Sequence, residues 1–403
     1  MEEWKEYKLG ELCNTISDTY KRGAKEVVLI NTSDVLEGKC LNHVRVPNEN
    51  LKGQFKKTFQ YNDILYSEIR PANKRFAFVD FDATDYIAST KLMVLRHNDK
   101  ITPQYLYYIL KSQNVIEELQ MLAESRSGTF PQITFSELSN LKVWLPNKKT
   151  QNKIISILSS LDDKIEVNRR INEQLEELAQ ALFKSWFVDF EPFKDGEFVE
   201  SELGMIPEGW KVETLGELCD SISKKHSFKK DKLIFLNTGD IHNNIYLHNN
   251  YMLVKDMPGQ AKKTIEKGDI LYSEIRPVNR HFALVNFDST DYVVSTKLMV
   301  IRSRNINNLR LFQYLTSKDV VDFLQQEAET RSGTFPQIRF ENIQRLKMII
   351  ASNDVETKYA SLLSSIYSRM ENNNKEITHL TNLRDTLLPK LMSGEIDVNE
   401  VEI

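Results

Sequence analysis

The chain contains one long pattern written twice. Residues 4–135 recur at 210–340, and the octapeptide at 64–71 (ILYSEIRP) returns letter for letter at 270–277. A repeat of about 200 residues is long enough for each copy to bury a core of its own, unlike the short units of a solenoid. The sequence therefore predicts two sibling domains in one chain. Two sibling domains in one chain suit a protein that binds two similar targets at a fixed separation.

The composition is that of an ordinary globular protein. The 403 residues are 41% apolar and 27% charged, which suits two or three domains. No apolar run approaches the roughly 18 to 20 residues that span a bilayer, and positions 1–8 are too charged for a signal peptide. We therefore expect a cytoplasmic protein with no membrane partner.

The three cysteines do not form a metal or disulfide pattern. They make an odd count without a CxxC pair, and Cys13 and Cys219 occupy the same position in the repeated Leu-Gly-Glu-Leu-Cys. A small buried hydrophobe is the expected role of this pair, because free cysteine is among the most buried residue types.

The net charge of −4 is unevenly distributed. The negative charge is concentrated in the segments that follow each repeat, at 150–200 and 354–403, whereas the repeats themselves are slightly basic. This permits local contacts to phosphate without the strong basicity that nucleic-acid-binding proteins usually have.

A long helical pattern follows each repeat. Apolar residues recur at alternating spacings of four and three residues from Ile154 and again from Tyr359. Neither pattern contains a Gly or a Pro until Pro389 in the second. This heptad stripe predicts two helices that each need a partner along their length. The predicted pairing positions are Leu158, Leu161, Ile165, Asn168, Leu175 and Leu182 in the first helix, and Leu363, Ile366, Met370, Asn373, Leu380 and Leu387 in the second.

A polar residue interrupts the stripe at the same place in both helices, at Asn168 and Asn373. An asparagine buried in such a seam costs stability and fixes the register, so it favours pairing of the two helices with each other. A helix whose stripe is offset and whose asparagine faces solvent is the alternative. If the helices pair, some 36 residues give a rod of roughly 54 Å.

Within each repeat, short apolar runs separated by turn signals predict strands. They lie at 27–30, 76–79 and 92–95, and at 233–236 and 298–301 in the second copy. A helix is predicted at 103–122 and its counterpart at 309–326. The fold class is therefore α+β, with two repeated mixed α/β domains, each followed by a long helix.

No catalytic signature is present. The sequence lacks the phosphate-binding loop GxxxxGK[ST], GxGxxG, GxSxG, HExxH and the NPPY-type motif of amino-methyltransferases. No histidine has metal-ligand spacing. Asp82 and Asp85 recur as Asp288 and Asp291, but a turn between strands explains them better than an acid–base pair. We predict no catalytic residue, no metal and no cofactor in this chain.

The repeats share polar groups that suit backbone phosphates. Gly lets a backbone approach a ligand closely, and Arg, Lys, Ser, Thr and Asn donate hydrogen bonds to phosphate oxygens. The candidates are Ser67, Arg70, Asn73, Lys91, Arg126, Ser127 and Thr129, with their counterparts Ser273, Arg276, Asn279, Lys297, Arg331, Ser332 and Thr334. A purely structural turn in the repeated SGTFPQ is the alternative interpretation.

Two stretches differ between the repeats while remaining polar. They are 14–28 against 220–234, and 38–55 against 244–261. A shared scaffold with different loops suggests that the domains read different sequences through base edges. The candidates are Lys21, Arg22, Lys25, Lys224, Lys225, Lys229 and Lys230, together with Arg339, which stands where the first repeat has Thr134. Free drift of a solvated surface loop explains any single one of them equally well.

Five segments, in this order, resemble the specificity subunit of type I restriction-modification systems. They are SGTFPQI at 127–133, Leu-Pro at 145–146, LFKSWFVDFEP at 182–192, GMIPEGW at 204–210 and LLPKLMSGEI at 387–396. The resemblance covers almost the whole chain. The familiar Glu-Gln before the first helix is Thr150-Gln151 here, and the second helix begins Val-Glu-Thr at 355–357.

The resemblance implies two target recognition domains, each reading half of a bipartite asymmetric site in double-stranded DNA. It also implies that the helices pair as an antiparallel coiled coil, set the spacer and dock two modification (methyltransferase) subunits and, in systems that have one, a restriction subunit. S-adenosylmethionine, ATP and Mg²⁺ would then belong to those partners, and this chain would have no activity of its own.

The resemblance also sets the domain limits. We expect target recognition domains at 1–149 and 205–353, helical spacers at 150–187 and 354–392, a linker at 188–204 and a tail at 393–403. Two other classes remain. A protein-only scaffold holding two partners apart fits the modest charge, and an enzyme with a cryptic nuclease site lacks any motif. Steep salt dependence of binding to duplex DNA would separate the DNA-binding class from the scaffold.

Overall fold

The chain divides into two compact units. Unit 1 consists of Met1–Asn168 together with Lys375–Ile403, and unit 2 is Arg169–Asn374. The structure, a computed structural model, describes residues 4–21, 23–49, 51–126, 130–331 and 336–398, with the backbone alone at Arg126 and Arg331. Both divisions between the units fall inside long helices. Each unit therefore contains one repeat and one part of each long helix.

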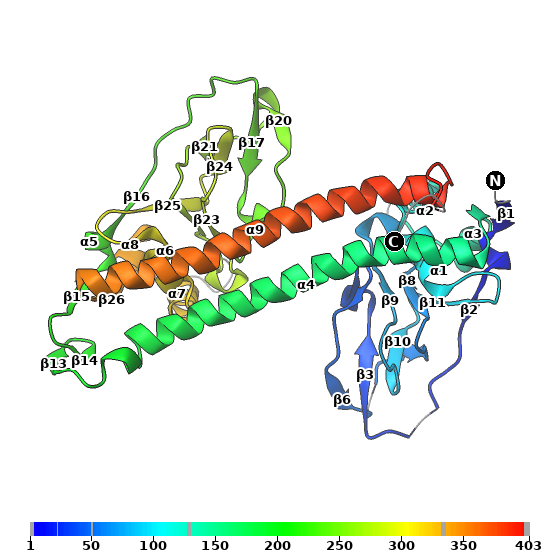
Figure 1. The fold of residues 1–403 in the computed structure, drawn as a ribbon, viewed down its shortest axis with the longest axis horizontal. Helices are drawn as coiled ribbons and strands as arrows, with labels where there is room; N and C mark the ends of the chain where they lie inside the picture. The colour runs from blue at the N-terminus through cyan, green and yellow to red at the C-terminus, as the bar shows by residue number, and fades with distance from the viewer. Residues whose placement is uncertain (1–3, 22, 50, 127–129, 332–335, 399–403) are drawn as a thin grey trace. The chain divides into compact units, whose positions relative to one another are not determined.

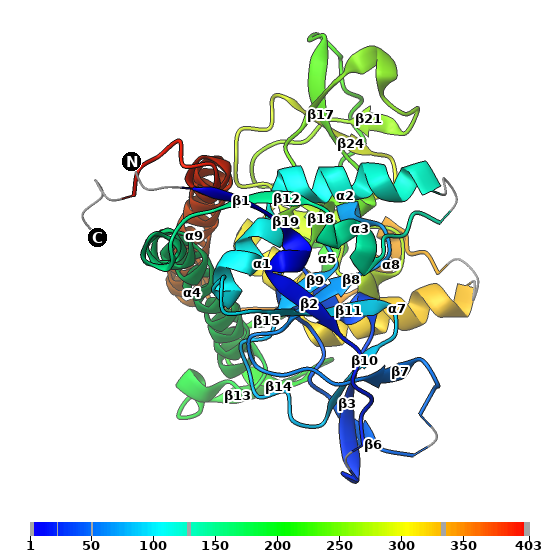
Figure 2. The ribbon, with the colours of Figure 1, turned by 90° about the vertical axis from the view of Figure 1, so that its right-hand side faces the viewer.

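Unit 1 is built on two four-stranded sheets (Figures 1 and 2). The first has the order β2-β11-β8-β9, and the second the order β6-β3-β10-β7, in which only β3 and β10 run parallel. The strands are β1 (Lys5–Lys8), β2 (Cys13–Ile16), β3 (Glu26–Ile30), β4 (Val35–Leu36), β5 (Lys39–Cys40), β6 (Arg45–Pro47), β7 (Phe55–Lys57), β8 (Ile64–Ser67), β9 (Phe76–Phe78), β10 (Tyr86–Ser89), β11 (Leu92–His97) and β12 (Lys142–Leu145). The pairs β1-β12 and β4-β5 complete it.

Unit 2 repeats this plan. Its sheets have the orders β16-β25-β22-β23 and β20-β17-β24-β21, with β17 parallel to β24. The strands are β15 (Lys211–Thr214), β16 (Cys219–Ser221), β17 (Lys232–Leu236), β18 (Ile241–His242), β19 (Ile245–Tyr246), β20 (Tyr251–Leu253), β21 (Ala261–Lys263), β22 (Ile270–Ser273), β23 (Phe282–Leu284), β24 (Tyr292–Ser295), β25 (Leu298–Ser303) and β26 (Lys347–Ile350). The hairpin of β13 (Phe198–Ser201) and β14 (Gly204–Pro207) precedes them.

The predicted strands are confirmed at β3, β9, β11, β17 and β25, but the prediction of one helix at 103–122 is wrong. Two helices stand there, α1 (Pro103–Lys111) and α2 (Gln113–Arg126), and likewise α6 (Asn308–Thr316) and α7 (Lys318–Arg331) in unit 2. Ser112 breaks the first pair: it has an extended backbone, and its hydroxyl donates to the Ile109 carbonyl at 2.7 Å. Ser317 does the same with Tyr314 at 2.8 Å. A serine hydroxyl that bonds a helix carbonyl competes with the next turn of helix.

The core has two layers in each unit because side chains alternate across the strands. In β8, Leu65 faces the other sheet, whereas Ile64 and Tyr66 face the helices. Their counterparts Leu271, Ile270 and Tyr272 divide in the same way. The sheet β2-β11-β8-β9 is thus covered by helices on one face and by the second sheet on the other.

The prediction for the repeated cysteines is confirmed. Cys13 and Cys219 are buried in the helix-side cores of their units. Burial raises the pKa of each thiol to about 12, so both thiols are protonated at neutral pH.

The two long helices are α4 (Lys148–Phe187) and α9 (Asn353–Met392). They run antiparallel within each unit, because later residues of α4 contact earlier residues of α9. In unit 1, Asp162 contacts Arg384 and Asn168 contacts Glu376. The short helices are α3 (Phe135–Ser139), α5 (Leu215–Leu218) and α8 (Phe340–Gln344). Among the described residues, no helix combines the length and apolar character that crossing a bilayer requires.

Candidate nucleic-acid interface

Two loops meet at the same point in each unit. In unit 1 the loop after β8 bonds the segment before α3: the Arg70 amide donates to the Pro131 carbonyl at 3.1 Å, and the Ile133 amide donates to the Glu68 carbonyl at 2.8 Å. In unit 2 Arg276 bonds Pro336 at 3.1 Å and Ile338 bonds Glu274 at 2.8 Å. The repeated motif ILYSEIRP and the described end of SGTFPQ, far apart in sequence, therefore lie side by side in each unit.

The first loop has a tightly constrained backbone. Ser67 is buried, and its hydroxyl accepts from the Ile69 amide at 3.0 Å. Arg70 and Lys74, on either side of the short 3₁₀ helix at Pro71–Asn73, have φ of +45° and +52°. Left-handed φ costs a residue with a Cβ about 1 to 2 kcal/mol. Unit 2 repeats the strain at Arg276 and Arg280, with φ of +45° and +54°. Strain kept at the same two positions in both units marks the loop as a candidate functional segment.

A cation, a carboxylate and an amide gather where the loops meet. The Lys91 ammonium donates to the Gln132 Oε1 at 3.4 Å and lies 3.9 Å from the Glu68 carboxylate. In unit 2 the Lys297 ammonium lies 3.4 Å from the Gln337 Oε1 and 3.5 Å from the Glu274 carboxylate. We call these two sets the Lys91 and Lys297 clusters. Glu68 and Gln132 were not among the predicted site residues, although both lie in the repeated motifs.

In each unit a buried aspartate that precedes one inner strand, β8 or β22, pairs with an arginine of the adjacent strand, β11 or β25. Asp63 is 1% exposed and receives two hydrogen bonds from the Arg96 guanidinium, at 2.8 and 2.7 Å. The hydrogen bond to Asp63 raises the pKa of Arg96, as the corresponding bond to Asp269 does for Arg302. Bidentate ion pairs of this kind constrain the geometry of both side chains in addition to bringing opposite charges together.

A second lysine lies beneath each cluster. The Lys57 ammonium donates to the carbonyls of Thr90 and Leu92 at 3.1 and 2.8 Å, and Lys263 does the same with Thr296 and Leu298. Burial lowers the pKa of Lys57 and of Lys263. These lysines secure the strand ends, so the more exposed Lys91 and Lys297 are the cations left to face a ligand.

The other predicted contact residues lie on the surface with one exception. Arg70, Asn73, Lys21 and Lys25, and in unit 2 Arg276, Asn279, Lys224, Lys225, Lys229, Lys230 and Arg339, are exposed. The exception is Ser67 with its counterpart Ser273: both are buried and form the turn described above, so the hypothesis that they contact phosphate is not favoured by their position. Arg22, Ser127, Thr129, Ser332, Thr334 and the side chains of Arg126 and Arg331 lie outside the described residues.

Arg339 stands at the start of a short helix. Thr134, its counterpart, begins α3, and both its amide and its hydroxyl donate to the Glu137 carboxylate, at 2.6 and 2.9 Å. At Arg339 only the backbone takes this role, with the amide donating to the Asn342 Oδ1 at 3.0 Å. The arginine side chain is therefore not needed to cap α8.

The repeated aspartates serve turns. Asp82 accepts from the Thr84 amide at 3.0 Å, and Asp288 accepts from the Thr290 amide at the same distance. Asp85 accepts a hydrogen bond from the Tyr20 hydroxyl at 2.8 Å. The prediction of a turn between strands is confirmed, because an aspartate that accepts from the amide two residues on is a turn-forming aspartate.

None of the predicted helix-pairing positions is fully exposed. Leu158, Ile165, Asn168, Leu363 and Asn373 are buried, and Leu161, Leu175, Leu182, Ile366, Met370, Leu380 and Leu387 are half-buried. In unit 1 the Asn168 side-chain amide donates to the Glu376 carboxylate at 2.8 Å.

Unit 2 pairs its seam asparagine with another asparagine. The Asn373 amide donates to the Asn172 Oδ1 at 2.8 Å, and the Asn172 amide donates to Asn374 at the same distance. Hydrogen-bonded amides that are buried between helices allow one register only.

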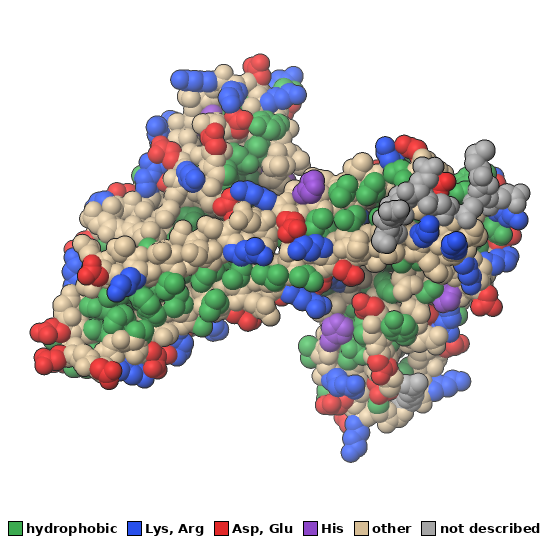
Figure 3. Space-filling model, in the orientation of Figure 1, with side chains coloured by type: hydrophobic (Ala, Val, Ile, Leu, Met, Phe, Trp, Pro, Cys, Tyr) green, Lys and Arg blue, Asp and Glu red, His purple; other side chains and the backbone are tan. Residues whose placement is uncertain are grey.

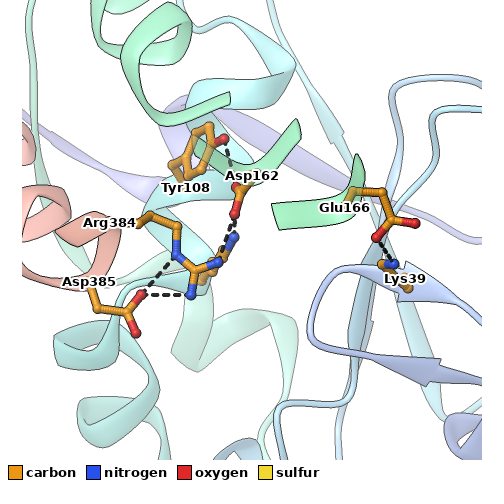
Figure 4. Close-up of polar contacts among 7 residues, drawn as sticks. Lys39, Tyr108, Asp162, Glu166, Arg384 and Asp385 are labelled. Carbon is orange, nitrogen blue, oxygen red and sulfur yellow. Dashed lines mark hydrogen bonds and ion pairs between the residues drawn. The ribbon is translucent and has the colours of Figure 1, made fainter. Parts of the chain in front are cut away.

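A charged network joins α4 and α9 to α1 in unit 1, and a second ion pair joins α4 to β5 (Figure 4). The Asp162 carboxylate on α4 accepts from the Tyr108 hydroxyl at 2.9 Å, from Lys111 at 3.0 Å and from Arg384 on α9 at 2.7 Å. Lys39 of β5 forms an ion pair with Glu166, one turn further along α4. The helices are thus held to the same unit that carries the Lys91 cluster.

The chain is similar to proteins of known kind over nearly its whole length. The model of the type I restriction modification DNA specificity domain matches residues 1–177 and again 207–382. The type I restriction enzyme HindI specificity subunit of Haemophilus influenzae is 34% identical and aligns with 98% of this chain and 100% of its own length. The type I restriction enzyme MjaIX specificity subunit of Methanocaldococcus jannaschii is 32% identical, over 75% of this chain and 71% of its own.

A solved structure supports the fold. The type I restriction-modification system S subunit from M. genitalium superimposes with a TM-score of 0.54, at 18% sequence identity, over 97% of this chain and 96% of its own.

Proposed function

Because the chain belongs to the type I restriction modification DNA specificity family, we propose that it reads a bipartite, asymmetric site in duplex DNA, with one unit at each half-site. The observation that carries this proposal is the pair of Lys91 and Lys297 clusters. The same cation and amide stand on the same two loops in both units, and exposed Arg70 and Arg276 flank them.

The clusters suit the part of DNA that both half-sites share. Phosphate contacts position a protein on the duplex, whereas contacts to base edges specify the sequence. A lysine and an arginine repeated in both units suit the backbone, which is the same at every sequence. The segments at 14–28 and 220–234, which differ between the units, suit base edges in the major groove.

The helices supply the second part of the proposal. α4 and α9 would set the gap between half-sites and dock two methyltransferase subunits, with a restriction subunit in systems that have one. S-adenosylmethionine, ATP and Mg²⁺ would be bound by those subunits, and this chain would contribute no catalytic residue. Because its substrate would be the cell's own DNA, we place the assembly in the cytoplasm.

Co-expression with the partner methyltransferase tests the proposal. Genome-wide mapping of methyladenine should give one motif with two unlike half-sites separated by a fixed gap, and the chain alone should methylate nothing. A perfectly palindromic motif would contradict the proposal that the two units recognise different half-sites. Methylation by the purified chain with S-adenosylmethionine would contradict the proposal that catalysis belongs to the partner subunits.

DNA binding by the complex should weaken steeply with salt. The logarithm of affinity falls with the logarithm of salt concentration by about 0.9 for each phosphate contacted. A binding constant indifferent to salt would favour a protein scaffold instead.

A further inference from the structure

One divergent segment is held on the same backbone frame in both units. In unit 1 the Tyr20 amide donates to the Lys56 carbonyl and the Thr58 amide donates to the Asp18 carbonyl, both at 2.8 Å. In unit 2 the His226 amide donates to the Lys262 carbonyl at 2.8 Å, and the Thr264 amide donates to the Lys224 carbonyl at 3.0 Å. Residues 18–20 and 224–226 therefore occupy equivalent places at the edges of β7 and β21. We call them the edge triplets.

The side chains on this common frame differ in charge. Asp18 and Thr19 are exposed in unit 1, and the exposed residues at the same two places in unit 2 are Lys224 and Lys225. The third residue is half-buried in both units and is locally held: the Tyr20 hydroxyl donates to Asp85, and the His226 Nδ1 accepts from the Phe228 amide at 2.9 Å. The first two residues are thus free to differ without disturbing the frame.

The neighbouring turn changes with the triplet. Unit 1 has Gln60 and Tyr61 where unit 2 has Glu266 and Lys267. The Lys224 ammonium lies 3.9 Å from the Glu266 carboxylate, which also pairs with Arg302 at 2.9 Å. An open cavity of about 490 Å³ lies between this turn and the edge triplet of unit 2. Figure 3 shows lysine and arginine side chains gathered at the tip of unit 2, over β17, β20 and β21.

The charge of each edge triplet determines which chemical groups of DNA it can contact. A carboxylate is repelled by phosphate, so Asp18 suits a base edge that donates, such as the amino group of cytosine or adenine. A lysine ammonium suits the O6 and N7 acceptors of guanine. A backbone-only surface would favour the same cationic residues in both units, as the Lys91 and Lys297 clusters show.

Resting on the proposed DNA-reading function, we propose that the edge triplets determine the different base preferences of the two units. Asp18 reads a base that presents an amino donor in the half-site of unit 1. Lys224 and Lys225, at the rim of the cavity, read guanine in the half-site of unit 2.

Reciprocal exchange of the two exposed positions is the experiment. The full chain with its co-expressed partner subunits is incubated with randomised duplex DNA, and the bound DNA is sequenced. Lys224→Asp with Lys225→Thr should replace guanine by an amino-donor base in one half-site only, and Asp18→Lys with Thr19→Lys should do the reverse in the other. Each preference should change by about 5- to 150-fold, the usual range for one base contact.

Single and control variants keep each outcome decisive. Lys225→Thr and Thr19→Lys each change one exposed side chain and should shift the same half-sites more weakly. Lys211→Thr removes an exposed lysine of unit 2 on β15, outside the proposed DNA contacts and the docking helices, and should leave the motif unchanged.

Three outcomes would overturn an inference. An unchanged motif in the exchange variants removes the triplets from base reading. A uniform loss for all sequences, with a shallower salt slope, makes them phosphate contacts. A wild-type complex that enriches no motif overturns the proposed function itself.

Discussion

Lys91 and Lys297 occupy equivalent places in the two units, and they lead to a different prediction from the residues in which the units differ. Both are about half exposed, and each is paired with a glutamate and a glutamine from the two repeated loops. A lysine that contacts phosphate binds all sequences alike.

Lys91→Gln should therefore weaken DNA binding by the complex for every sequence and leave the recognised motif unchanged. The salt slope should fall by about 0.9 for the one lost phosphate contact. Titration of a cognate and an unrelated duplex at several salt concentrations measures both effects, with Lys211→Gln on β15 as the control. Loss confined to the cognate duplex would mean that Lys91 reads a base.

Arg339→Thr should affect only the half-site of unit 2. The arginine side chain is exposed and α8 is capped through the backbone, and threonine is the residue that caps α3 in unit 1, so the fold should tolerate the change. We expect weaker binding of that half-site, measured by the same titration on duplexes with one half-site scrambled. Equal affinity before and after the substitution would take Arg339 out of the interface.

The sequence predicted the environment of a single residue only where residue type alone indicates whether the side chain is exposed or buried. Exposed lysines and arginines in polar loops followed from the pattern, and so did buried Cys13. Buried Ser67 did not, because only the turn geometry shows that its hydroxyl is used by the backbone of Ile69. The partners Glu68 and Gln132 come together across more than 60 residues of chain, which no local spacing indicates.

At the scale of elements, the two units differ in how α4 and α9 are fastened. The Asp162 network of unit 1 has no charged counterpart in the repeat: Tyr367 stands where unit 1 has Asp162, and Ala179 stands where it has Arg384. Tyr367 and Ala179 are buried in the core of unit 2. Unit 2 fastens α9 by other groups instead: the buried Arg310 of α6 lies 3.8 Å from the Glu356 carboxylate, and the Tyr359 hydroxyl donates to Gln313.

Asp162→Asn should destabilise unit 1 by on the order of 3 kcal/mol, because it leaves the largely buried Lys111 without its carboxylate and leaves Arg384 with Asp385 alone. The carboxylate is 26% exposed, which places the effect toward the lower end of the range for buried pairs. Urea unfolding measures the loss. Asp163→Asn, on the next and exposed residue, is the matched control, and an equal effect of both substitutions would show that the network adds nothing.

The same network should make unit 1 sensitive to acid. Burial alone would raise the pKa of Asp162, but Lys111 and Arg384 together outweigh it and hold the pKa below its ordinary value of 3.8. A carboxyl whose pKa is lower in the folded state stabilises the fold above the ordinary value, and this contribution is lost as pH falls through the folded value. Unfolding followed from neutral pH to below pH 3.8 should show a smaller fall in stability for Asp162→Asn than for the wild type.

Elements with strong periodicity were predicted well, and the junctions between them were not. The heptad stripe indicated both long helices, and alternating apolar runs indicated β3, β11 and β17. The single predicted helix at 103–122 became two because one serine hydroxyl at Ser112 takes a carbonyl of the preceding turn. Serine in a helical pattern is common, and its side-chain hydrogen bond is not visible in the sequence.

At the scale of the whole molecule, both helices run unbroken through the division between the units, α4 after Asn168 and α9 after Asn374. Inserting four residues at both places lengthens each helix by roughly 6 Å. Since duplex DNA rises about 3.4 Å per base pair, the preferred gap between half-sites should grow by one or two base pairs, with unchanged half-sites. Methylation mapping of the co-expressed complex reads the gap.

Four residues are close to one helical turn, so the seam is nearly preserved, although a local stutter results. The control is an insertion of the same four residues after Glu202, between β13 and β14, which should leave the gap as it was. Methylation at the original spacing by an active complex with lengthened helices would show that something else sets the distance.

The division into units also has a consequence for biosynthesis. Unit 2 is one continuous stretch, Arg169–Asn374, whereas unit 1 needs Lys375–Ile403 to supply Leu388 and Leu391 to its core and Arg384 to Asp162. Domains fold as units while the ribosome elongates the chain at about 5 to 20 residues per second. The repeat that emerges first must therefore wait for the last residues of the chain before it can close, and the repeat that emerges second has all its parts earlier. A nascent chain that is cut short would lose the first recognition unit and keep the second.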